Sequence, residues 1–335
     1  MPPFLDGQSS VNVTLFFTPG GILSLDSINQ IFMFTGPFTL IWTDLSLAWN
    51  KSLHDVHVIS IDPTPIWIPE IFLLNAEGNT RISLPSHPSV YVTHNGTVVM
   101  VMRDKFRTIC VTDAFDFPFD EQNCELNLIP VEAFVNLSAT LTRNPVLSSI
   151  LMKKSEWVLK NVTNKNIYID GFEIKSVTLT LKRQSLFYVL SIIIPMALTS
   201  IMNAFVFILP ADSGEKVSFL VSIFVSHAVF LNFVYDIMPR TSTRVPKIMI
   251  YLICILLQSF LSLLAVITTL RIRNNKVQGD HKRVSTVVDQ TVGDCSTGMS
   301  KMKDRLHNLD SQKLDSILFV VSLFIAILNT IVLIT

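Results

Sequence analysis

The chain has 335 residues, and its 26 basic and 26 acidic side chains leave no net formal charge. This balance gives no indication of a nucleic acid or another polyanion as a partner. Hydrophobic residues make up 49% and charged residues 16% of the chain, and the mean hydropathy is +0.48. These values are high for a soluble protein and typical of a chain that lies half in a membrane. The length allows two domains.

Residues 1–184 alternate between short β-rich segments and turn signals. The expected strands are Val11–Phe17, Phe38–Trp42, His57–Ile61, Thr97–Met102, Arg107–Thr112, Glu125–Leu128 and Glu173–Leu181. The expected turns are Pro19-Gly20-Gly21, Asn79, Pro85, Pro88, Asn95-Gly96 and Asn144-Pro145. Several short strands at this spacing predict a β-sandwich.

Two of the four cysteines, Cys110 and Cys124, lie close together in this strand-rich region, whereas Cys254 falls in an apolar segment and Cys295 in a polar linker. We therefore expect one disulfide, Cys110–Cys124, and two free thiols. A bridged loop of this length stabilises the fold by roughly 3 kcal/mol in the chain-entropy model, and it requires an oxidising compartment. The alternative is a pair of unrelated buried thiols.

All matches to the glycosylation signal N-x-S/T lie before residue 165. One such match arises easily by chance, but five on one side of the first apolar segment predict that this region is extracellular. The predicted acceptors are Asn12, Asn50, Asn95, Asn136 and Asn161. Met1-Pro2-Pro3-Phe4 lacks the charged start and apolar core of a signal peptide, so we expect a mature or trimmed chain.

Four apolar segments follow, each of about twenty residues or more, at 186–209, 217–238, 247–270 and 316–335. Twenty helical residues span roughly 30 Å, the thickness of the bilayer's hydrocarbon, so the segments predict four membrane helices. Pro195 falls inside the first one, where neighbouring groups can satisfy the freed carbonyl.

The stretch 271–313 contains nine Lys and Arg against five Asp. A basic excess beside a membrane helix marks the cytoplasmic side, so charge and glycosylation signals independently predict the same orientation. Linker 274–298 is expected to be disordered, and 299–315 to be helical and to continue into the last membrane helix. The predicted division is 1–184, 185–270, 271–315 and 316–335.

Four motifs together give the chain a resemblance to a known family. They are Cys110…Phe117-Pro118-Phe119-Asp120…Cys124; Trp42-Thr43-Asp44…Leu47-Ala48-Trp49; Trp67-Ile68-Pro69-Glu70…Asn75, where the family usually has Asp at the Glu70 position; and Pro210-Ala211-Asp212-Ser213-Gly214-Glu215-Lys216 with Met238-Pro239. Over essentially its whole length the chain resembles a subunit of the Cys-loop receptors, the pentameric ligand-gated ion channels, and most closely their nicotinic- and serotonin-type cation-selective members.

The resemblance implies an α+β membrane protein of the plasma membrane. An extracellular immunoglobulin-like β-sandwich would precede a four-helix transmembrane bundle, and the whole would assemble as a pentamer. The implied partners are four further subunits, identical in a homopentamer, an unknown small-molecule agonist, permeating cations and membrane lipid. No cofactor is implied.

Small and polar residues recur every three or four positions along 215–236, on one helical face with a carboxylate at each end. These residues are Glu215, Ser218, Ser222, Val225, Val229, Asn232 and Asp236. Five copies around an axis would form acidic rings that attract cations, with aliphatic rings that gate by dewetting; the family usually has Leu at the Val225 position. The alternative is a helix-packing face. His227 lies off this face and is expected to be an interhelical hydrogen-bonding residue.

Selectivity for cations is inferred mainly from Glu215. Anion-selective members of the family usually carry a Pro-Ala insertion at this place, and the insertion is absent here. Lys216 is adjacent, but in the family geometry it would point away from the axis.

The resemblance also implies residues that couple ligand binding to the pore. Phe117, Pro118, Phe119 and Asp120 would lie at the membrane face of the outer domain, against the 239–246 linker. Asp26 and Arg183 match the family's interface charges and are predicted to pair, partly shielded from water. The alternative for this pair is simple juxtamembrane capping.

The family binds its agonist between subunits in an aromatic box that holds a cationic amine. Here Val131 stands seven residues after Cys124 and Pro37 stands five before Trp42, where aromatic residues are expected. The hairpin near 165–172 lacks the paired cysteines of nicotinic agonist-binding subunits. Trp67 is expected to pack in the core. The candidates for the ligand site are Val131, Phe134, Tyr168, Phe172, Pro37, Val99 and Val101.

Three functions compete. The first is a homopentameric cation channel gated by an extracellular ligand. The second is a non-conducting or modulatory subunit that needs a partner subunit, which the degraded aromatic box favours. The third is a membrane enzyme, which we do not expect because no nucleophile–base set, metal motif or phosphate loop appears. His54, His57, His87 and His94 lack metal-ligand spacing, so no metal site is predicted.

Overall fold

The computed structural model describes residues 1–4, 9–18, 21–78, 82, 88–141, 155–169, 171–209, 215–238, 244–288 and 297–334. Several sequence expectations fall outside these residues or concern side chains that are not described: the turns at Pro19-Gly20, Asn79, Pro85 and Asn144-Pro145, the segment Pro210–Gly214, Pro239, His54, His87 and Cys295. The chain divides into two compact units, and each is described by itself.

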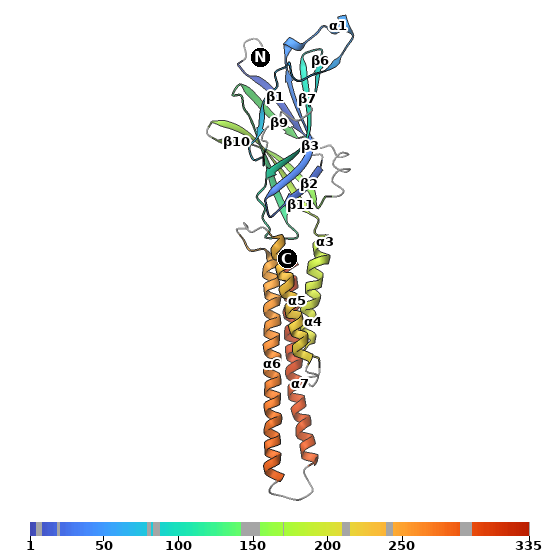
Figure 1. The fold of residues 1–335 in the computed structure, drawn as a ribbon, viewed down its shortest axis with the longest axis vertical. Coiled ribbons are helices and arrows are strands. Elements are labelled where there is room, and N and C mark those ends of the chain that lie inside the picture. Colours follow the sequence, from blue (N-terminus) through green and yellow to red (C-terminus); the bar gives the residue numbers. More distant parts are fainter. Residues whose placement is uncertain are drawn as a thin grey trace. The chain divides into compact units, whose positions relative to one another are not determined.

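The first unit, here the β unit, comprises Met1–Ala114, Pro118–Gln184 and Pro239–Arg244 and contains two sheets. The larger, seven-stranded sheet has the order β4 (Val58–Ile61), β6 (Ser89–Thr93), β7 (Thr97–Ile109), β3 (Ile31–Thr43), β1 (Val11–Phe17) and β9 (Val135–Leu141), with β2 (Gly21–Asp26) paired to β3 (Figure 1). The four-stranded sheet has the order β10 (Trp157–Ile169), β11 (Phe172–Arg183), β8 (Glu121–Pro130) and β5 (Ile71–Leu73).

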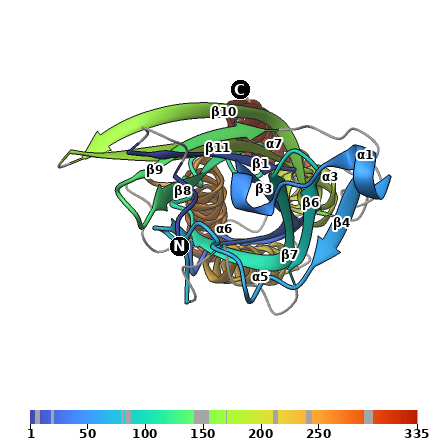
Figure 2. The ribbon, with the colours of Figure 1, turned by 90° about the horizontal axis from the view of Figure 1, so that it is seen from above.

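Two short helical turns, η1 (Leu45–Leu47) and α1 (Lys51–His54), follow β3. Asp44 caps η1 and Asn50 caps α1, each through a side-chain oxygen that accepts a backbone N–H. Seen from above, the β10–β11 hairpin extends from the side of the β unit opposite to α1 and β4 (Figure 2).

The inward faces of the two sheets form one hydrophobic core. Burial along β3 alternates strictly, so that Phe32, Phe34 and Trp42 point inward, as the two-residue period of a strand requires. Trp67 packs against this core, with its ring 6.1 Å from that of Trp42. The predicted β-sandwich is thus confirmed.

The disulfide is also confirmed. Cys110 directly follows β7 of the larger sheet, and Cys124 lies in β8 of the smaller one, with their Cα atoms 5.0 Å apart. Both cysteines are buried, so the bridge ties the two sheets together inside the core.

Every predicted strand overlaps an observed strand, but the segment Arg107–Thr112 is the end of β7, which stops at Ile109. Sequence reasoning missed β2, β5, β6, β9 and β10. The polar sequence of β10 explains its omission, because most of its side chains beyond Leu159 are exposed and show no alternation.

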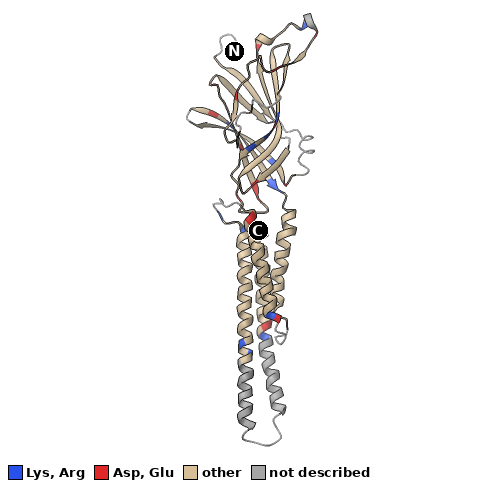
Figure 3. Cartoon of the chain, in the orientation of Figure 1, with Lys and Arg blue, Asp and Glu red and all other residues tan. Residues whose placement is uncertain are grey.

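The second unit, here the helical unit, comprises Phe115–Phe117, Ser185–Met238 and Val245–Thr335. Its elements are α3 (Leu186–Tyr188), a π-helical turn η3 (Val189–Ile193), α4 (Ile194–Phe205), α5 (Glu215–Ile237), α6 (Lys247–Val288) and α7 (Thr297–Ile334). Four stretches are long and apolar enough to cross a membrane, Leu186–Phe205, Glu215–Ile237, Lys247–Asn274 and Lys313–Leu333. The described charged residues of this unit lie at the ends of these stretches, as the blue and red segments of the ribbon show (Figure 3).

Pro195 lies in the first turn of α4, directly after η3. A proline lacks the N–H that would close an α-helical turn, and a π turn is a common way to accommodate such a break. The first predicted membrane segment therefore remains helical from Leu186 to Phe205.

The expectation of disorder over 274–298 was wrong for its first part, because α6 continues as a helix to Val288. Extending an existing helix by polar residues such as Arg and Lys costs little once the membrane span has nucleated it. The predicted helix over 299–315 is confirmed as the start of α7, which runs without interruption into the last span.

Candidate functional site

Helix α5 has two contrasting faces. All the residues that the sequence places on the pore face are exposed, namely Glu215, Ser218, Ser222, Val225, Val229, Asn232 and Asp236. The buried residues of α5 are Lys216, Leu220, Ile223, His227 and Val234. Val225 and Val229 are 53% and 61% exposed. Val229 also borders a groove of about 460 Å³ whose other walls include Phe187 and Ile192.

His227 holds the buried face of α5 to two other helices. Its side chain is buried, and its Nδ1 atom hydrogen-bonds with Ser259 Oγ of α6 at 2.7 Å. Its Nε2 atom hydrogen-bonds with Thr199 Oγ1 of α4 at 3.0 Å. The prediction of an interhelical hydrogen-bonding histidine is confirmed.

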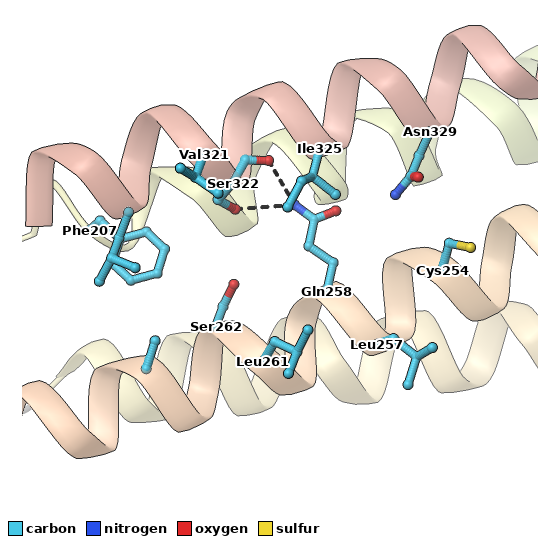
Figure 4. A pocket seen from close by; sticks show the side chains of 12 residues that line it. Phe207, Cys254, Leu257, Gln258, Leu261, Ser262, Val321, Ser322, Ile325 and Asn329 are labelled. Atoms are coloured by element: carbon cyan, nitrogen blue, oxygen red, sulfur yellow. Dashed lines mark hydrogen bonds between the residues drawn. The ribbon is translucent and has the colours of Figure 1, made fainter.

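Further polar contacts join α4, α6 and α7. Gln258 Nε2 donates to the backbone oxygen and Oγ of Ser322 at 3.0 and 3.1 Å, and Ser200 Oγ donates to Gln258 Oε1 at 3.2 Å. Figure 4 shows Gln258 reaching from α6 to Ser322 of α7 beside a mainly apolar cavity of about 400 Å³. Asn203 Nδ2 donates to Ser262 Oγ at 3.1 Å. Such polar groups between membrane helices favour specific packing.

Arg183 is the centre of a charge network in the β unit. Its Nε and Nη2 atoms donate to the two carboxylate oxygens of Asp120 at 2.7 and 3.1 Å, and both side chains are buried. Arg183 also pairs with Glu156, and its guanidinium lies 4.2 Å from the centre of the Trp157 ring. Gln122 Nε2 donates to Asp120 at 2.6 Å. The bidentate geometry and the extra donor give both carboxylate oxygens of Asp120 partners in this buried place.

The predicted pair between Asp26 and Arg183 was wrong. The carboxylate of Asp26 instead accepts the backbone N–H groups of Ile28 and Asn29, each at 2.9 Å, and the Asn29 side chain at 2.8 Å. These bonds lower the pKa of Asp26, and the bond from the Asn29 backbone N–H has the largest effect. Local donors of the β2–β3 turn thus satisfy Asp26, while Asp120 is the buried partner of Arg183.

The disulfide loop contributes residues to both units. Within the helical unit, Phe115 accepts a hydrogen bond from the Lys247 N–H at 2.9 Å, and Asp116 pairs with the Lys247 side chain at 2.9 Å. The Phe117 ring lies 4.9 Å from the Tyr188 ring.

In the β unit, Pro118 and Asp120 are buried and Phe119 is 43% exposed. The ends of the loop are held there too, because Asp113 N donates to Gln122 Oε1 at 2.9 Å. Arg244 forms an ion pair with Asp113.

The candidate ligand residues fall into separate groups. Pro37, Val99 and Val101 share the outward face of the β3–β7 pair in the larger sheet. Val131, directly after β8, is 47% exposed, and the half-buried Phe134 contacts Phe4 and Trp67. Tyr168 and Phe172 are 71% and 60% exposed at the end of the β10–β11 hairpin. Their separation between two sheets means that the described residues of one chain do not assemble these side chains into one pocket.

All predicted glycosylation acceptors have exposed side chains in the β unit, namely Asn12, Asn50, Asn95, Asn136 and Asn161. Asn12 and Asn136 are direct partners in the parallel β1–β9 pair.

Several charged partners were not found from the sequence: Glu156 for Arg183, Asp113 for Arg244, Asp116 for Lys247 and Asp315 for Lys216. No local motif marks these pairs, because their members are far apart along the chain. Among the described residues, no group of three or more His, Cys, Asp or Glu could hold a metal ion.

Comparison with known proteins places both units in one family. Residues 1–185 match the neurotransmitter-gated ion-channel ligand binding domain, and residues 192–313 match the neurotransmitter-gated ion-channel transmembrane region. The 5-hydroxytryptamine receptor 3A of Mus musculus is 31% identical over 81% of this chain and 57% of that protein. The acetylcholine receptor subunit beta-type unc-29 of Caenorhabditis elegans is 31% identical over 77% of this chain and 52% of that protein.

The neuronal acetylcholine receptor subunit beta-3 of Homo sapiens is 28% identical over 83% of this chain and 62% of that protein. The chain therefore spans between about half and two thirds of the length of these relatives. The matches cover the β-sandwich and the membrane helices, and they concern ion channels, not enzymes. This chain is a multi-pass membrane protein that belongs to the neurotransmitter-gated ion channels, the Cys-loop receptors.

Proposed function

We propose that this chain is a subunit of a cation-selective pentameric channel that an extracellular ligand opens. The observation that carries the proposal is the exposed face of α5, which has carboxylates at both ends and small polar or aliphatic residues between them. Polar residues at membrane depth are costly unless they face a protein interior or water. These residues are exposed in the single chain, and a water-filled path between the subunits of a pentamer would explain why they are not covered by protein.

Five copies of α5 around an axis would form a ring of Glu215 at the cytoplasmic mouth and a ring of Asp236 at the outer mouth. Both rings attract cations and raise their local concentration. Val225 and Val229 would form aliphatic rings between them, which close the path by dewetting.

Coupling between ligand and pore is assigned to the disulfide loop and the charges around it. The division of the loop between the two units supports this role, since Phe117 belongs to the helical unit and Pro118, Phe119 and Asp120 belong to the β unit. The Asp120–Arg183 pair lies at the base of the same loop. Asp26 is not included in this proposed coupling, because its carboxylate stabilises the β2–β3 turn.

The proposed ligand site lies between subunits and uses Val131, Phe134, Tyr168 and Phe172 from one face of a chain. Pro37, Val99 and Val101 would come from the facing chain. Their location on two different sheets suits such an arrangement. Most of these residues are aliphatic, which favours an agonist less dependent on cation–π attraction than an amine.

The proposed location is the plasma membrane, with the β unit outside and residues 271–313 inside. The exposure of the five sequon asparagines supports the outer assignment, and the basic excess of 271–313 supports the inner one.

Voltage clamp of cells that express only this chain tests the proposal. External Na⁺ is exchanged for a large organic cation while amines, protons and apolar ligands are screened. Current that follows the cation gradient and falls in Glu215→Gln is expected. Current that follows the chloride gradient would overturn the cation selectivity.

The second candidate is a subunit that conducts only with a partner subunit. The aliphatic residues at the ligand positions favour it. Silent surface-labelled pentamers of this chain that gain current with a co-expressed relative would support this candidate.

A further inference from the structure

Lys216 is a buried cation at the first turn of the proposed pore helix. Its side chain is only 5% exposed, although it directly follows the exposed Glu215. Its Nζ atom lies 3.1 Å from Oδ2 of Asp315, which is 25% exposed and belongs to α7. Among the described residues, Asp315 is the carboxylate that forms an ion pair with Lys216.

Two general effects disfavour a cation in this place. The N-terminus of a helix carries a partial positive charge, so an ammonium in the first turn is repelled. A buried charge without a partner is strongly destabilised. Asp315 offsets both effects, and it does so from a helix that contributes no residue to the exposed face of α5.

We propose that Asp315 is a selectivity-supporting residue that acts through Lys216. Its carboxylate cancels the Lys216 charge, so that the acidic side chain of Glu215 determines the field at this end of the pore. The inference rests on the proposed function, because it assigns a role to Asp315 only if cations pass Glu215. Lys216 directly follows the exposed Glu215, and charges are screened only beyond a Debye length of about 8 Å at physiological salt, so an uncancelled charge on Lys216 would oppose that of Glu215.

The test compares unitary currents and reversal potentials of four channels: the wild type, Asp315→Asn, Asp315→Glu and the double variant Lys216→Met/Asp315→Leu. Asp315→Asn leaves Lys216 uncancelled, so inward cation conductance is expected to fall by about two-fold or more. The reversal potential in diluted NaCl is expected to shift toward that of an anion-permeable pore. Asp315→Glu and the double variant, which leave no uncancelled cation, are expected to retain wild-type values.

Asp304→Asn is the matched control, because it makes the same charge change on the same helix about 16.5 Å away along the axis, well beyond the Debye length. Surface labelling reports assembly for each variant. Wild-type cation conductance in Asp315→Asn, or a double variant as impaired as Asp315→Asn, would overturn this inference alone. A wild-type channel that carries no current, or one that carries chloride, would overturn the proposed function and this inference together.

Discussion

Arg183 and Asp120 form a buried, bidentate ion pair across the β unit, with N–O distances of 2.7 and 3.1 Å. Arg183 ends β11 and Asp120 precedes β8, so the pair fixes the disulfide loop at the point where β8 begins. The stacking of Arg183 on Trp157 and its contact with Glu156 restrict the guanidinium to this orientation.

Asp120→Asn is expected to destabilise the β unit by about 1.5–3 kcal/mol, because it removes the buried bidentate partner of Arg183 and leaves the half-exposed Glu156 as its remaining described carboxylate partner. Thermal unfolding of the purified protein measures this effect. Lys160→Gln is the matched control, since it breaks the exposed pair with Glu121 and should cost at most about 1 kcal/mol. Equal losses in the two variants would contradict the buried role of Asp120.

Glu132 is expected to make stability depend on pH. Burial, and to a lesser degree the Glu70 carboxylate, raise the pKa of Glu132. The folded protein therefore holds this proton more tightly than the unfolded chain. The resulting stability is fully present below the unfolded pKa, about 4.3, and is lost as the pH rises through the raised folded pKa.

Glu132→Gln should consequently raise the melting temperature at pH 7 and change it less at about pH 4. Asp26→Asn should change the melting temperature in the opposite direction and lower it at pH 7. The fold lowers the pKa of Asp26, so the ionised carboxylate stabilises the protein at pH values above the pKa of the unfolded chain. Melting curves of both variants between about pH 4 and pH 7 make the comparison. If Glu132→Gln lowered the melting temperature at pH 7, the pH dependence could not be assigned to the raised pKa of Glu132.

Much of the fold could be predicted because its signals are local. The exposed face of α5 follows from a repeat of three and four residues, and the inward face of β3 follows from alternation. The disulfide was predicted from two cysteines in a strand-rich region. These signals depend on the residues within one element or one loop, which the sequence displays directly.

The charge pairs could not be predicted in the same way. Asp315 pairs with Lys216, which lies 99 residues away in the sequence, and Asp113 pairs with Arg244, which lies 131 residues away. Only the folded chain brings these residues together. The error at Asp26 has a related cause, because the donors that satisfy it lie two and three residues away in its own turn. Asp26 was assigned to Arg183 only because its position matches a charged residue of the family. That match does not show that backbone donors in the same turn compete with Arg183 for the Asp26 carboxylate.

Asn12 and Asn136 are not expected to carry glycans on the same chain. They are direct partners on adjacent strands, where strands lie about 4.8 Å apart and paired side chains share one face. A glycan on one asparagine therefore blocks the other. Mass spectrometry of the intact protein during stepwise deglycosylation should show at most one of these two sites occupied on each chain. Asn12→Gln should raise the glycan occupancy at Asn136. Chains glycosylated at both sites would contradict this.

His227→Leu should weaken the helical unit by about 0.6–1.7 kcal/mol, the range measured for interhelical hydrogen bonds in membranes. Ser259 keeps a partner in the Ile255 carbonyl, and Thr199 keeps one in the Met196 carbonyl, so the loss stays modest. A double-mutant cycle with Ser259→Ala, read by unfolding in detergent, isolates the His227–Ser259 contact. Strict additivity would show that the contact contributes nothing.

Val225→Leu tests the aliphatic gate. Val225 is 53% exposed on the proposed pore face, and a larger side chain should narrow the closed path and strengthen dewetting. We expect Val225→Leu to reduce spontaneous current and to lower sensitivity to any agonist that opens the channel. Val217→Leu is the control, because the half-buried Val217 packs against the helical core away from that face. If single-channel recordings show the same spontaneous open probability in the wild type and Val225→Leu, the closed gate lies elsewhere on α5.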